Sequence, residues 1–471
     1  MSHLLSTTKN ILHRKSSKAH MPPKPSSPVT IAIIGCGQRG RAYADYALTA
    51  PDLCKVVAIA EPRPKTRARA QELYNVDATL VFNSWRELHA ASEETEKTVG
   101  SRLADAVVVA VQDAMHKEVV LAFAAQGYNI LCEKPMSTSL EDLLEMDEAV
   151  ARAGVIFGMG HVLRYSPYTR EITEYVQSGT LGKLVNIVQV EPVGYWHFAH
   201  SYVRGAWSQE ATSSFALMAK CCHDIDLLCF WMLPSTPARV SSFGSLHHFK
   251  KSQKPPEAGA ATRCLECPME KSCAYSAKKI YLDAVNRGHT GWPVSPIVDG
   301  IPDIENVTDA LKTGPYGLCV YESPNDVCDH QVVNLEFSDG TTASFTMVAY
   351  SSLICDRQVR LHFVNGEIVG DMRTFTVHDF RTGTRRTVTP KSEGGGHGGG
   401  DLGLIHAFVS AVRTGRQEAL GTTLEEIVKS HMTVFAAETS RKEGRVVDCV
   451  EFERTVRERV RAAAAAATTE A

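Results

Sequence analysis

A lysine at the end of an expected buried strand is the first residue in the chain that could take part in catalysis. The mostly apolar run Tyr128–Cys132 predicts a strand, and it leads directly into Glu133-Lys134-Pro135. Proline restricts the local backbone, so the neighbouring lysine is held in place. Its ammonium group could polarise a substrate oxygen, or it could form a salt bridge that closes a domain. We treat Lys134 as a candidate catalytic residue.

A histidine lies at the start of an apolar helix, in the run Ala219-Lys220-Cys221-Cys222-His223-Asp224-Ile225-Asp226. Offsets of three and four place Lys220, His223 and Asp224 on one helical face. Imidazole can accept and donate a proton near neutral pH, although a single histidine in such a helix is often structural. A cation at Lys220 would lower the imidazole pKa. Lys220 and His223 are candidate catalytic residues.

Aromatic and polar residues alternate irregularly after the expected strand Val185–Val193. Aromatic faces suit the C–H faces of a sugar ring and polar groups suit its hydroxyls, but the same composition also fits an aromatic loop folded onto itself. The glycine-rich run Gly394–Gly400 is either a flexible linker or a loop whose backbone approaches a substrate. The candidate substrate-binding residues are Arg164, Tyr195, His197, His200, Tyr202, Asp224 and His397.

Three cysteines lie close together in the sequence ATRCLECPMEKSCAYSA. The spacing Cys264-x-x-Cys267, with Cys273 beyond it, is that of thiolates in a structural zinc site, and Cys319 is the expected fourth ligand. Free thiols are the alternative. Zinc would staple a region of irregular sequence at about residues 250–324, which is too long for a plain loop.

A dinucleotide fingerprint occupies Val29–Arg41, where an apolar run breaks into Gly35, Gly37 and Gly40. In G-x-G-x-x-G the first glycine makes a tight turn, the second lets the backbone approach a pyrophosphate, and the third lets the helix pack against the strand. An apolar strand at Lys55–Ala60 follows and ends at Glu61. These features predict a Rossmann domain that binds a nicotinamide dinucleotide.

The choice between NAD and NADP depends on Glu61 and Arg63. A carboxylate at the end of the second strand accepts hydrogen bonds from the ribose hydroxyls of NAD, whereas a guanidinium could bind the 2′-phosphate of NADP. We expect NAD to be preferred, with NADP possible. The candidate cofactor-binding residues are Gly35, Gly37, Gln38, Arg39, Gly40, Glu61, Arg63, Gln112, His116 and Glu133.

The order of expected elements divides the chain. Alternating strands and helices predict a doubly wound parallel sheet over residues 29–158. Residues 159–445 contain hairpin signals at Asp339-Gly340 and Asn365-Gly366, which predict an α+β domain with a largely antiparallel, open sheet. We expect residues 1–28 to be a disordered basic tail, and residues 446–471 to be a C-terminal segment whose Ala462–Ala467 run frays into solvent.

Composition excludes several function classes. The 471 residues carry a formal net charge of -3, so the chain has no basic footprint for nucleic acid. We expect no membrane partner, because no apolar run reaches the ~18 residues needed to span a bilayer. The 13 cysteines are too few for a disulfide scaffold. We expect a cytoplasmic protein, with a mitochondrial location as the minor alternative because the tail composition resembles a transit peptide.

A Rossmann fingerprint, the Glu133-Lys134-Pro135 motif and a following antiparallel sheet together resemble the Gfo/Idh/MocA oxidoreductases over about residues 29–445. The resemblance implies a nicotinamide cofactor, a sugar or polyol substrate, a catalytic lysine at Lys134 and homo-oligomers formed through the open sheet. Family members typically carry Asp-x-x-x-His-x-x-Asp where this chain has Ala219, His223 and Asp226. The departure at Ala219 puts the usual acid–base relay in doubt.

Three functions follow from these features. The first is an NAD(P)-dependent oxidoreductase that transfers a hydride between nicotinamide and a sugar, polyol or glycoside carbon. The second is a glycoside hydrolase that retains its NAD and acts through transient oxidation at C3. The third is a dinucleotide-binding sensor without catalysis, which the missing aspartate at Ala219 would explain.

Overall fold

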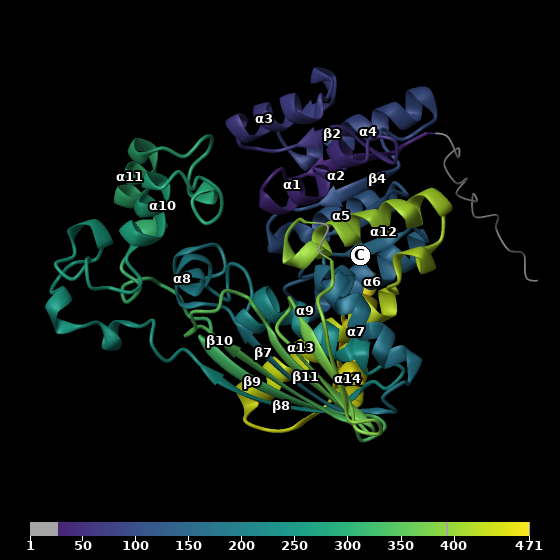
Figure 1. The fold of residues 1–471 in the computed structure, drawn as a ribbon. Coiled ribbons are helices and arrows are strands. Elements are labelled where there is room, and N and C mark those ends of the chain that lie inside the picture. The colour runs from purple at the N-terminus through teal and green to yellow at the C-terminus, as the bar shows by residue number, and fades with distance from the viewer. Residues whose placement is uncertain (1–26, 392–393, 471) are drawn as a thin grey trace, which may run out of the picture.

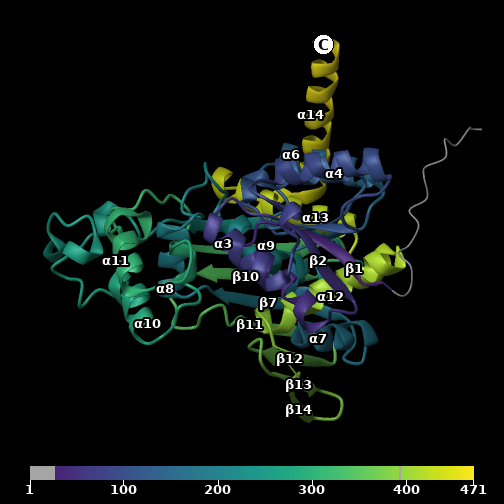
Figure 2. The same cartoon turned by 90° about the horizontal axis from the view of Figure 1, so that it is seen from above.

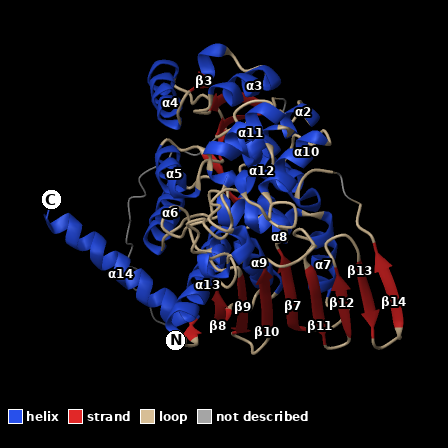
Figure 3. Cartoon of the chain, turned by 90° about the vertical axis from the view of Figure 1, so that its left-hand side faces the viewer, coloured by secondary structure: helices blue, strands red, loops and turns tan. Residues whose placement is uncertain are grey.

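The computed structural model describes residues 27–391 and 394–470, and it contains two sheets (Figure 1). The expected disordered tail, residues 1–28, lies outside the described residues except for its last two positions. The first sheet is parallel and is built by the N-terminal part of the chain. The second is larger and is built mainly by residues 184–388. Figure 3 shows the strands of the second sheet side by side, with helices gathered on one side of them.

The parallel sheet has six strands in the order β3-β2-β1-β4-β5-β6. Its strands are short and apolar because helices cover both faces, as in other doubly wound sheets. The strands are β1 (Val29–Ile34), β2 (Cys54–Ala60), β3 (Val81–Phe82), β4 (Ala106–Val109), β5 (Asn129–Cys132) and β6 (Phe157–Met159). The helices between them are α1 (Gln38–Ala44), α2 (Tyr46–Thr49), α3 (Pro64–Tyr74), α4 (Trp85–Val99), α5 (His116–Ala125) and α6 (Leu140–Ala153). The predicted Rossmann fold is confirmed.

The second sheet has nine strands in the order β14-β13-β12-β11-β7-β10-β9-β8-β15, antiparallel except for the β7–β10 pair. Its strands are β7 (Leu184–Pro192), β8 (Pro237–Ser245), β9 (His330–Phe337), β10 (Thr342–Val348), β11 (Gln358–Phe363), β12 (Gly366–Gly370), β13 (Phe375–Asp379), β14 (Thr384–Val388) and β15 (Val447–Asp448). Burial alternates along β10, where Ala343, Phe345 and Met347 are buried and the residues between them are not. One face therefore carries the core, as predicted for a largely antiparallel open sheet.

The remaining long helices join the two sheets. They are α7 (Pro167–Ser178), α9 (Ala216–Trp231), α12 (Gly400–Thr414) and α13 (Leu424–Glu443), with the short α8 (Tyr195–Phe198) after β7. Helices α9 and α13 pack on the core face of the second sheet. Helix α12 instead packs against the parallel sheet, because Leu404, Ile405 and Phe408 share a buried cluster with Ile31 and Ile33 of β1. The chain thus returns to its N-terminal sheet late in the sequence.

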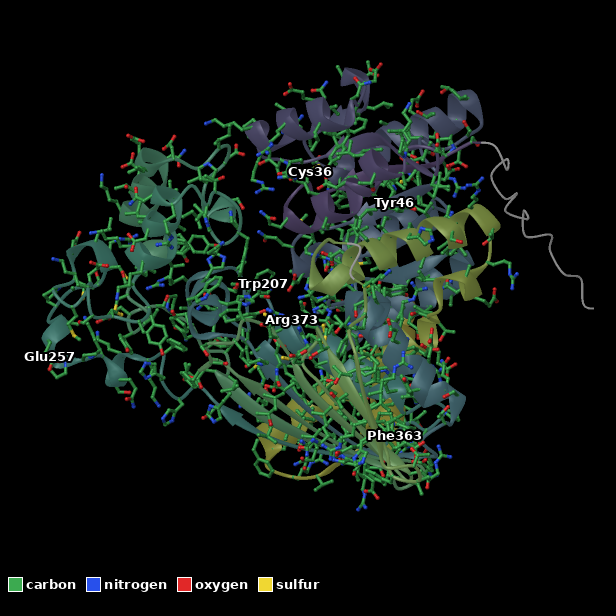
Figure 4. The ribbon with its side chains drawn as sticks, viewed as in Figure 1. Cys36, Tyr46, Trp207, Glu257, Phe363 and Arg373 are labelled. Atoms are coloured by element: carbon green, nitrogen blue, oxygen red, sulfur yellow. The ribbon has the colours of Figure 1, made fainter. Side chains whose placement is uncertain are left out.

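An irregular insertion separates β8 from β9 and contains α10 (Asp283–Asn286) and α11 (Ile304–Thr313). It lies to one side of both sheets, with Glu257 near its outer tip (Figure 4). Its own small apolar cluster includes Tyr281, Val294, Val307 and Leu311. This cluster supplies the stabilising core for which the sequence had suggested zinc.

The C-terminal segment is one helix, α14 (Cys449–Glu470), which projects from the body of the molecule (Figure 2). The run Ala462–Ala467, which was expected to fray, lies within this helix, and alanine has the highest intrinsic helix propensity. Among the described residues, no helix is both long enough and apolar enough to cross a membrane.

Candidate functional site

The glycine-rich turn between β1 and α1 has the geometry of a dinucleotide cradle. Gly35 has φ +92°, and a Cβ at this position would lie 2.4 Å from the carbonyl oxygen of Ala110. A Cβ at Gly40 would lie 1.8 Å from the carbonyl oxygen of Gly35, whereas one at Gly37 would meet only Arg63 at 3.6 Å. Gly37 is therefore open where a pyrophosphate would approach, and no side chain caps the first turn of α1. These residues fit a nicotinamide dinucleotide.

Glu61 and Arg63 lie beside this turn and bind one another. The Glu61 carboxylate accepts hydrogen bonds from the backbone N–H of Cys36 at 2.8 Å and from Nε and Nη2 of Arg63 at 2.8 and 3.0 Å. Burial alone would raise the pKa of Glu61, but the bonds from Arg63 and Cys36 lower it below its usual value. The carboxylate is thus ionised and the guanidinium is held against it.

Lys134 reaches from the carboxyl end of β5 to the helix that carries His223. Its Nζ donates a hydrogen bond to the carbonyl oxygen of Ala219 at 2.7 Å and lies 5.8 Å from the ring centroid of Trp207. That indole is fixed by a 2.9 Å bond from its Nε1 to Asp113. Figure 4 shows Trp207 between the Rossmann layer and the insertion. The ammonium group is therefore positioned where the two layers meet.

His223 is buried in α9, one helical turn after Ala219. Burial lowers its pKa well below the usual 6.5, and the charges of Lys134 and neighbouring groups lower it further. Its Nδ1 has no hydrogen-bond partner among the described residues. The ring is a neutral imidazole with a free nitrogen, which can accept a proton.

His397 approaches His223 from the glycine-rich run, with 5.8 Å between the ring centroids. Its Nδ1 lies 2.9 Å from Asp401, and Asp401 accepts two 2.9 Å bonds from Arg39. Arg39 also donates to Glu133 at 2.7 Å. The fingerprint helix, the end of β5 and the glycine-rich run are thus linked by one set of ion pairs beside His223.

The family model for the Gfo/Idh/MocA proteins, described as an oxidoreductase family with an NAD-binding Rossmann fold, matches residues 29–161. YteT of Bacillus subtilis (strain 168), whose name gives oxidoreductase as its class, is 22% identical over 319 residues, or 64% of this chain and 71% of YteT. The scyllo-inositol 2-dehydrogenase (NAD(+)) of the same strain is 26% identical over 33% of this chain and 42% of its own length. A levoglucosan dehydrogenase solved with NADH and levoglucosan superposes with a TM-score of 0.64 at 17% identity, covering 90% of this chain and 100% of that one.

Over residues 29–161 the chain is thus similar to the Gfo/Idh/MocA oxidoreductases. The matched residues include the fingerprint and Lys134, and the match confirms the resemblance that the sequence indicates. The alanine at position 219 also has a structural consequence. Alanine offers no side-chain acceptor, and it is the backbone carbonyl of this residue that binds Lys134.

Lys220 does not face His223, contrary to the predicted shared face. Its Nζ lies 3.3 Å from Glu191 and 3.0 Å from Sγ of Cys355. Asp224 is also turned toward the second sheet, where it binds Arg357 at 2.6 Å and Gln189 at 2.6 Å. The prediction was wrong because residues at offsets of three and four lie on opposite sides of the starting residue around the helix. Of the two, only Asp224, four residues after Lys220, lies in the same buried ionic network as Lys220.

The predicted aromatic run packs against the insertion. His197 Nδ1 lies 3.2 Å from Sγ of Cys355, and His200 Nδ1 lies 2.9 Å from the Tyr281 hydroxyl. Trp292 of the insertion contacts both rings, with centroid separations of 4.7 and 5.6 Å. Tyr202 is buried and Tyr195 is 37% exposed. Of these residues His197 is nearest the Lys220 network, while His200 is enclosed by aromatic rings.

Arg164 was predicted to bind substrate, but the structure contradicts this. Its guanidinium is buried and donates to Asp226 at 2.6 and 2.8 Å and to Glu426 at 2.6 Å. Arg164 holds the pKa of the buried Asp226 well below its usual value. Arg164 was expected in a cleft because it follows the last parallel strand. Its guanidinium instead links α9 to α13 through Asp226 and Glu426.

We expect Arg164→Ala to lower the free energy of unfolding by about 3–5 kcal/mol, because it leaves the buried Asp226 carboxylate unpaired. The ionised Asp226 contributes stability above its unfolded pKa of ~3.9, and this contribution is lost as the pH falls below that value. Thermal unfolding at neutral pH measures the loss. Arg381→Ala, which removes an exposed pair with Asp379, is the control and should have a much smaller effect on the free energy of unfolding. Equal losses in the two variants would contradict the prediction.

Three further predicted cofactor-binding residues have different surroundings. His116 is fully buried, with Nδ1 2.7 Å from the carbonyl oxygen of Pro135 and Nε2 3.3 Å from that of Val111. Both ring nitrogens therefore face the backbone, and His116 joins the ends of β4 and β5 structurally. Gln112 precedes the short turn Asp113–Met115 on the same edge of the sheet. Gln38 reaches the insertion and donates to Ser295 at 2.6 Å.

The predicted zinc ligands are not assembled. No three of the sulfur atoms of Cys264, Cys267, Cys273 and Cys319 lie within 4.8 Å of one another, and all four cysteines are free thiols. Cys264 instead accepts a 3.2 Å hydrogen bond from Arg204. A sequence spacing suited to zinc thus occurs here in a segment that an apolar cluster stabilises.

Ligand atoms of His161, Cys222 and His431 do gather within 4.8 Å of one another. However, Nε2 of His431 accepts a 2.9 Å bond from the backbone N–H of Met136, and its Nδ1 donates to the carbonyl oxygen of Ile427 at 2.8 Å. Neither nitrogen retains a lone pair for a metal. This buried group is part of the packing between α9, α13 and the Rossmann layer.

Sequence reasoning missed three residues that shape the site. Arg357 neutralises the Glu191 and Asp224 carboxylates, Trp207 lies over Lys134, and Trp292 covers the aromatic run. Each lies far in sequence from the residues it contacts and carries no local motif. For Asp401, the carboxylate that binds His397, the sequence offered one indication, which is its position directly after the glycine-rich run Gly394–Gly400.

Proposed function

We propose that the protein is a dehydrogenase that uses NAD to oxidise a hydroxyl-bearing carbon of a sugar or polyol, or catalyses the reverse reaction. The observation that carries this proposal is the placement of Lys134 and the neutral His223 together, at the end of a strand in the parallel sheet that also holds the glycine cradle. In open α/β sheets ligands bind outside the carboxyl ends of the strands. The named relatives that act on inositol and levoglucosan support the substrate class.

Each residue has a separate role in this proposal. A bound nicotinamide would supply the acceptor for the two electrons and the hydrogen of the oxidised carbon. Lys134 would bind the substrate oxygen and stabilise the negative charge that develops on it. His223 would take the hydroxyl proton at its free ring nitrogen, which its low pKa keeps unprotonated. His397, paired with Asp401, would then accept this proton from His223 and release it toward solvent.

The test begins with mass spectrometry of the natively purified protein, which should show a bound dinucleotide. A panel of sugars and polyols is then followed at the nicotinamide absorbance. Net NADH formation supports the dehydrogenase. Release of a free sugar from a glycoside without net cofactor reduction would point to the NAD-retaining hydrolase, and dinucleotide binding without turnover of any substrate would point to a sensor.

Cofactor choice should follow the Glu61–Arg63 pair. We expect NAD to bind more tightly than NADP by about tenfold or more, equivalent to ~1.4 kcal/mol, since the ionised Glu61 would repel a 2′-phosphate. Glu61→Ala removes the carboxylate that holds the Arg63 guanidinium and should narrow or invert this preference. Arg63→Ala should chiefly weaken the residual binding of NADP. Parallel calorimetric titrations measure these effects, and tighter NADP binding by the parent would contradict the assignment.

The second sheet suggests how copies of the chain associate. Val188 and Val369 project from its outer face and are 40% and 36% exposed, and the helices are gathered on the other side of the strands (Figure 3). An open sheet of this size can bury such a face against a second copy of the chain. Light scattering of the purified protein tests for a homo-oligomer.

A further inference from the structure

One segment of the insertion crosses the space between the aromatic run and the dinucleotide cradle. We call residues 292–300 the strap. Its middle is anchored in the insertion by Val294, which is 1% exposed and belongs to the insertion's apolar cluster. Its two ends contact parts of the chain that lie far away in sequence. Figures 1 and 4 show the insertion beside the Rossmann layer, with Cys36 of the cradle on the facing side.

The C-terminal end of the strap caps helix α3. Asp299 accepts hydrogen bonds from the backbone N–H of Lys65 at 3.2 Å, and from the backbone N–H and hydroxyl of Thr66 at 3.1 and 2.8 Å. The residue at the N-cap position, Arg63, makes no side-chain cap of its own. The insertion therefore supplies the cap that the local sequence lacks. This cap fixes the start of α3 directly after Glu61 and Arg63.

The middle of the strap touches the fingerprint itself. Ser295 accepts a 2.6 Å bond from Gln38, which follows the open glycine Gly37. Gly37, Gln38, Arg63, Ser295 and Val298 line one cavity. One wall of this cavity comes from the Rossmann fingerprint and the opposite wall from the insertion.

The N-terminal end of the strap packs into the aromatic run. Trp292 lies 4.9 Å from Trp196 and 4.7 Å from His197 between ring centroids. The strap is therefore anchored at both ends, on the proposed substrate side by its indole and on the cofactor side by Asp299. A segment held in this way restricts access to the cavity between its ends.

We propose that the strap is the outer wall of the adenosine end of the dinucleotide site, and that Ser295 and Asp299 are cofactor-retaining residues. This inference rests on the proposed function, because it assumes that the cradle binds NAD. The cofactor must pass the strap to leave, since the strap and the fingerprint enclose the same cavity. Loss of the strap's anchor on α3 should therefore weaken NAD binding and speed its release, without altering the groups that carry out the chemistry.

The test compares NAD binding by the full-length parent, Asp299→Ala and Asp303→Ala. Asp303 is a matched control, because it caps α11 within the same insertion through hydrogen bonds with Asn306. We expect Asp299→Ala to raise the dissociation constant and the dissociation rate of NAD about fivefold to tenfold, the size expected for one lost cap. Asp303→Ala should leave both constants within about twofold of the parent.

Hydrogen exchange of the parent gives a second readout that a purely structural role would not affect. Amides of residues 292–300 should exchange more slowly when NAD is added, whereas those of α11 should not change. Parent-like NAD binding by Asp299→Ala, together with unchanged exchange in the strap, would overturn the inference while leaving the proposed function intact. Failure of the parent to bind NAD would overturn both.

Discussion

Lys134→Ala is expected to leave NAD bound and to lower kcat by a factor of about 10² to 10³. This loss corresponds to ~3–4 kcal/mol of transition-state stabilisation, the usual effect of removing one positioned donor to a developing oxyanion. The ammonium group is positioned before substrate arrives, by its 2.7 Å bond to the Ala219 carbonyl and by the face of Trp207. Little energy is then needed to orient it during the reaction.

Steady-state kinetics and NAD titration of the same preparations measure the two parts of this prediction. Lys117→Ala is the control, since Lys117 forms half-exposed ion pairs with Asp142 and Glu145, and its loss should change kcat by less than about twofold. Lys134→Arg tests geometry, because a guanidinium keeps the charge but changes the position of the donor. If Lys134→Ala has the same kcat as the parent, Lys134 only holds the Rossmann layer against α9.

The fold could be predicted because its determinants are local. Apolar runs such as Val29–Ile34 and Ala106–Val109 can only be buried strands, and glycines at Gly35 and Gly40 are required where a side chain would clash with the backbone. Alternating residues in β9 and β10, joined at Asp339-Gly340, specify a hairpin with one covered face. These signals depend on a few neighbouring residues, so they can be read without knowing the long-range contacts.

The candidate site could be predicted only where a motif carries its residues. Lys134 and His223 were found in this way, and the structure brings them together through Ala219. The environment of His223 could not be found, because His397 reaches it only after α12 folds back against the parallel sheet. Likewise Arg164 follows a strand end, as a cleft residue would, but its neighbours Asp226 and Glu426 lie on helices far along the chain.

The surroundings of His223 determine its charge state, and its replacement should have the other large effect. The ring is buried beside Lys134 and near His397, and these surroundings lower its pKa well below 6.5. In the parent the imidazole is therefore neutral throughout about pH 6 to 8, and kcat/KM should not fall in that range through protonation of His223. The fall should begin only at lower pH, where the buried ring finally binds a proton.

His223→Ala should lower kcat/KM by a factor of about 10² to 10⁴, the range typical of a lost general base, and should remove that acid limb from the pH profile. NAD titration and thermal unfolding of the variant show whether the fold and the cofactor site survive. His406→Ala, which removes an imidazole bonded to Tyr46 in α12, is the control and should keep the parent's rate and profile. His397→Ala should retain more activity than His223→Ala, because His397 acts on the proton only after His223 has accepted it. If His223→Ala keeps the acid limb of the parent, another group is the base and His223 is structural.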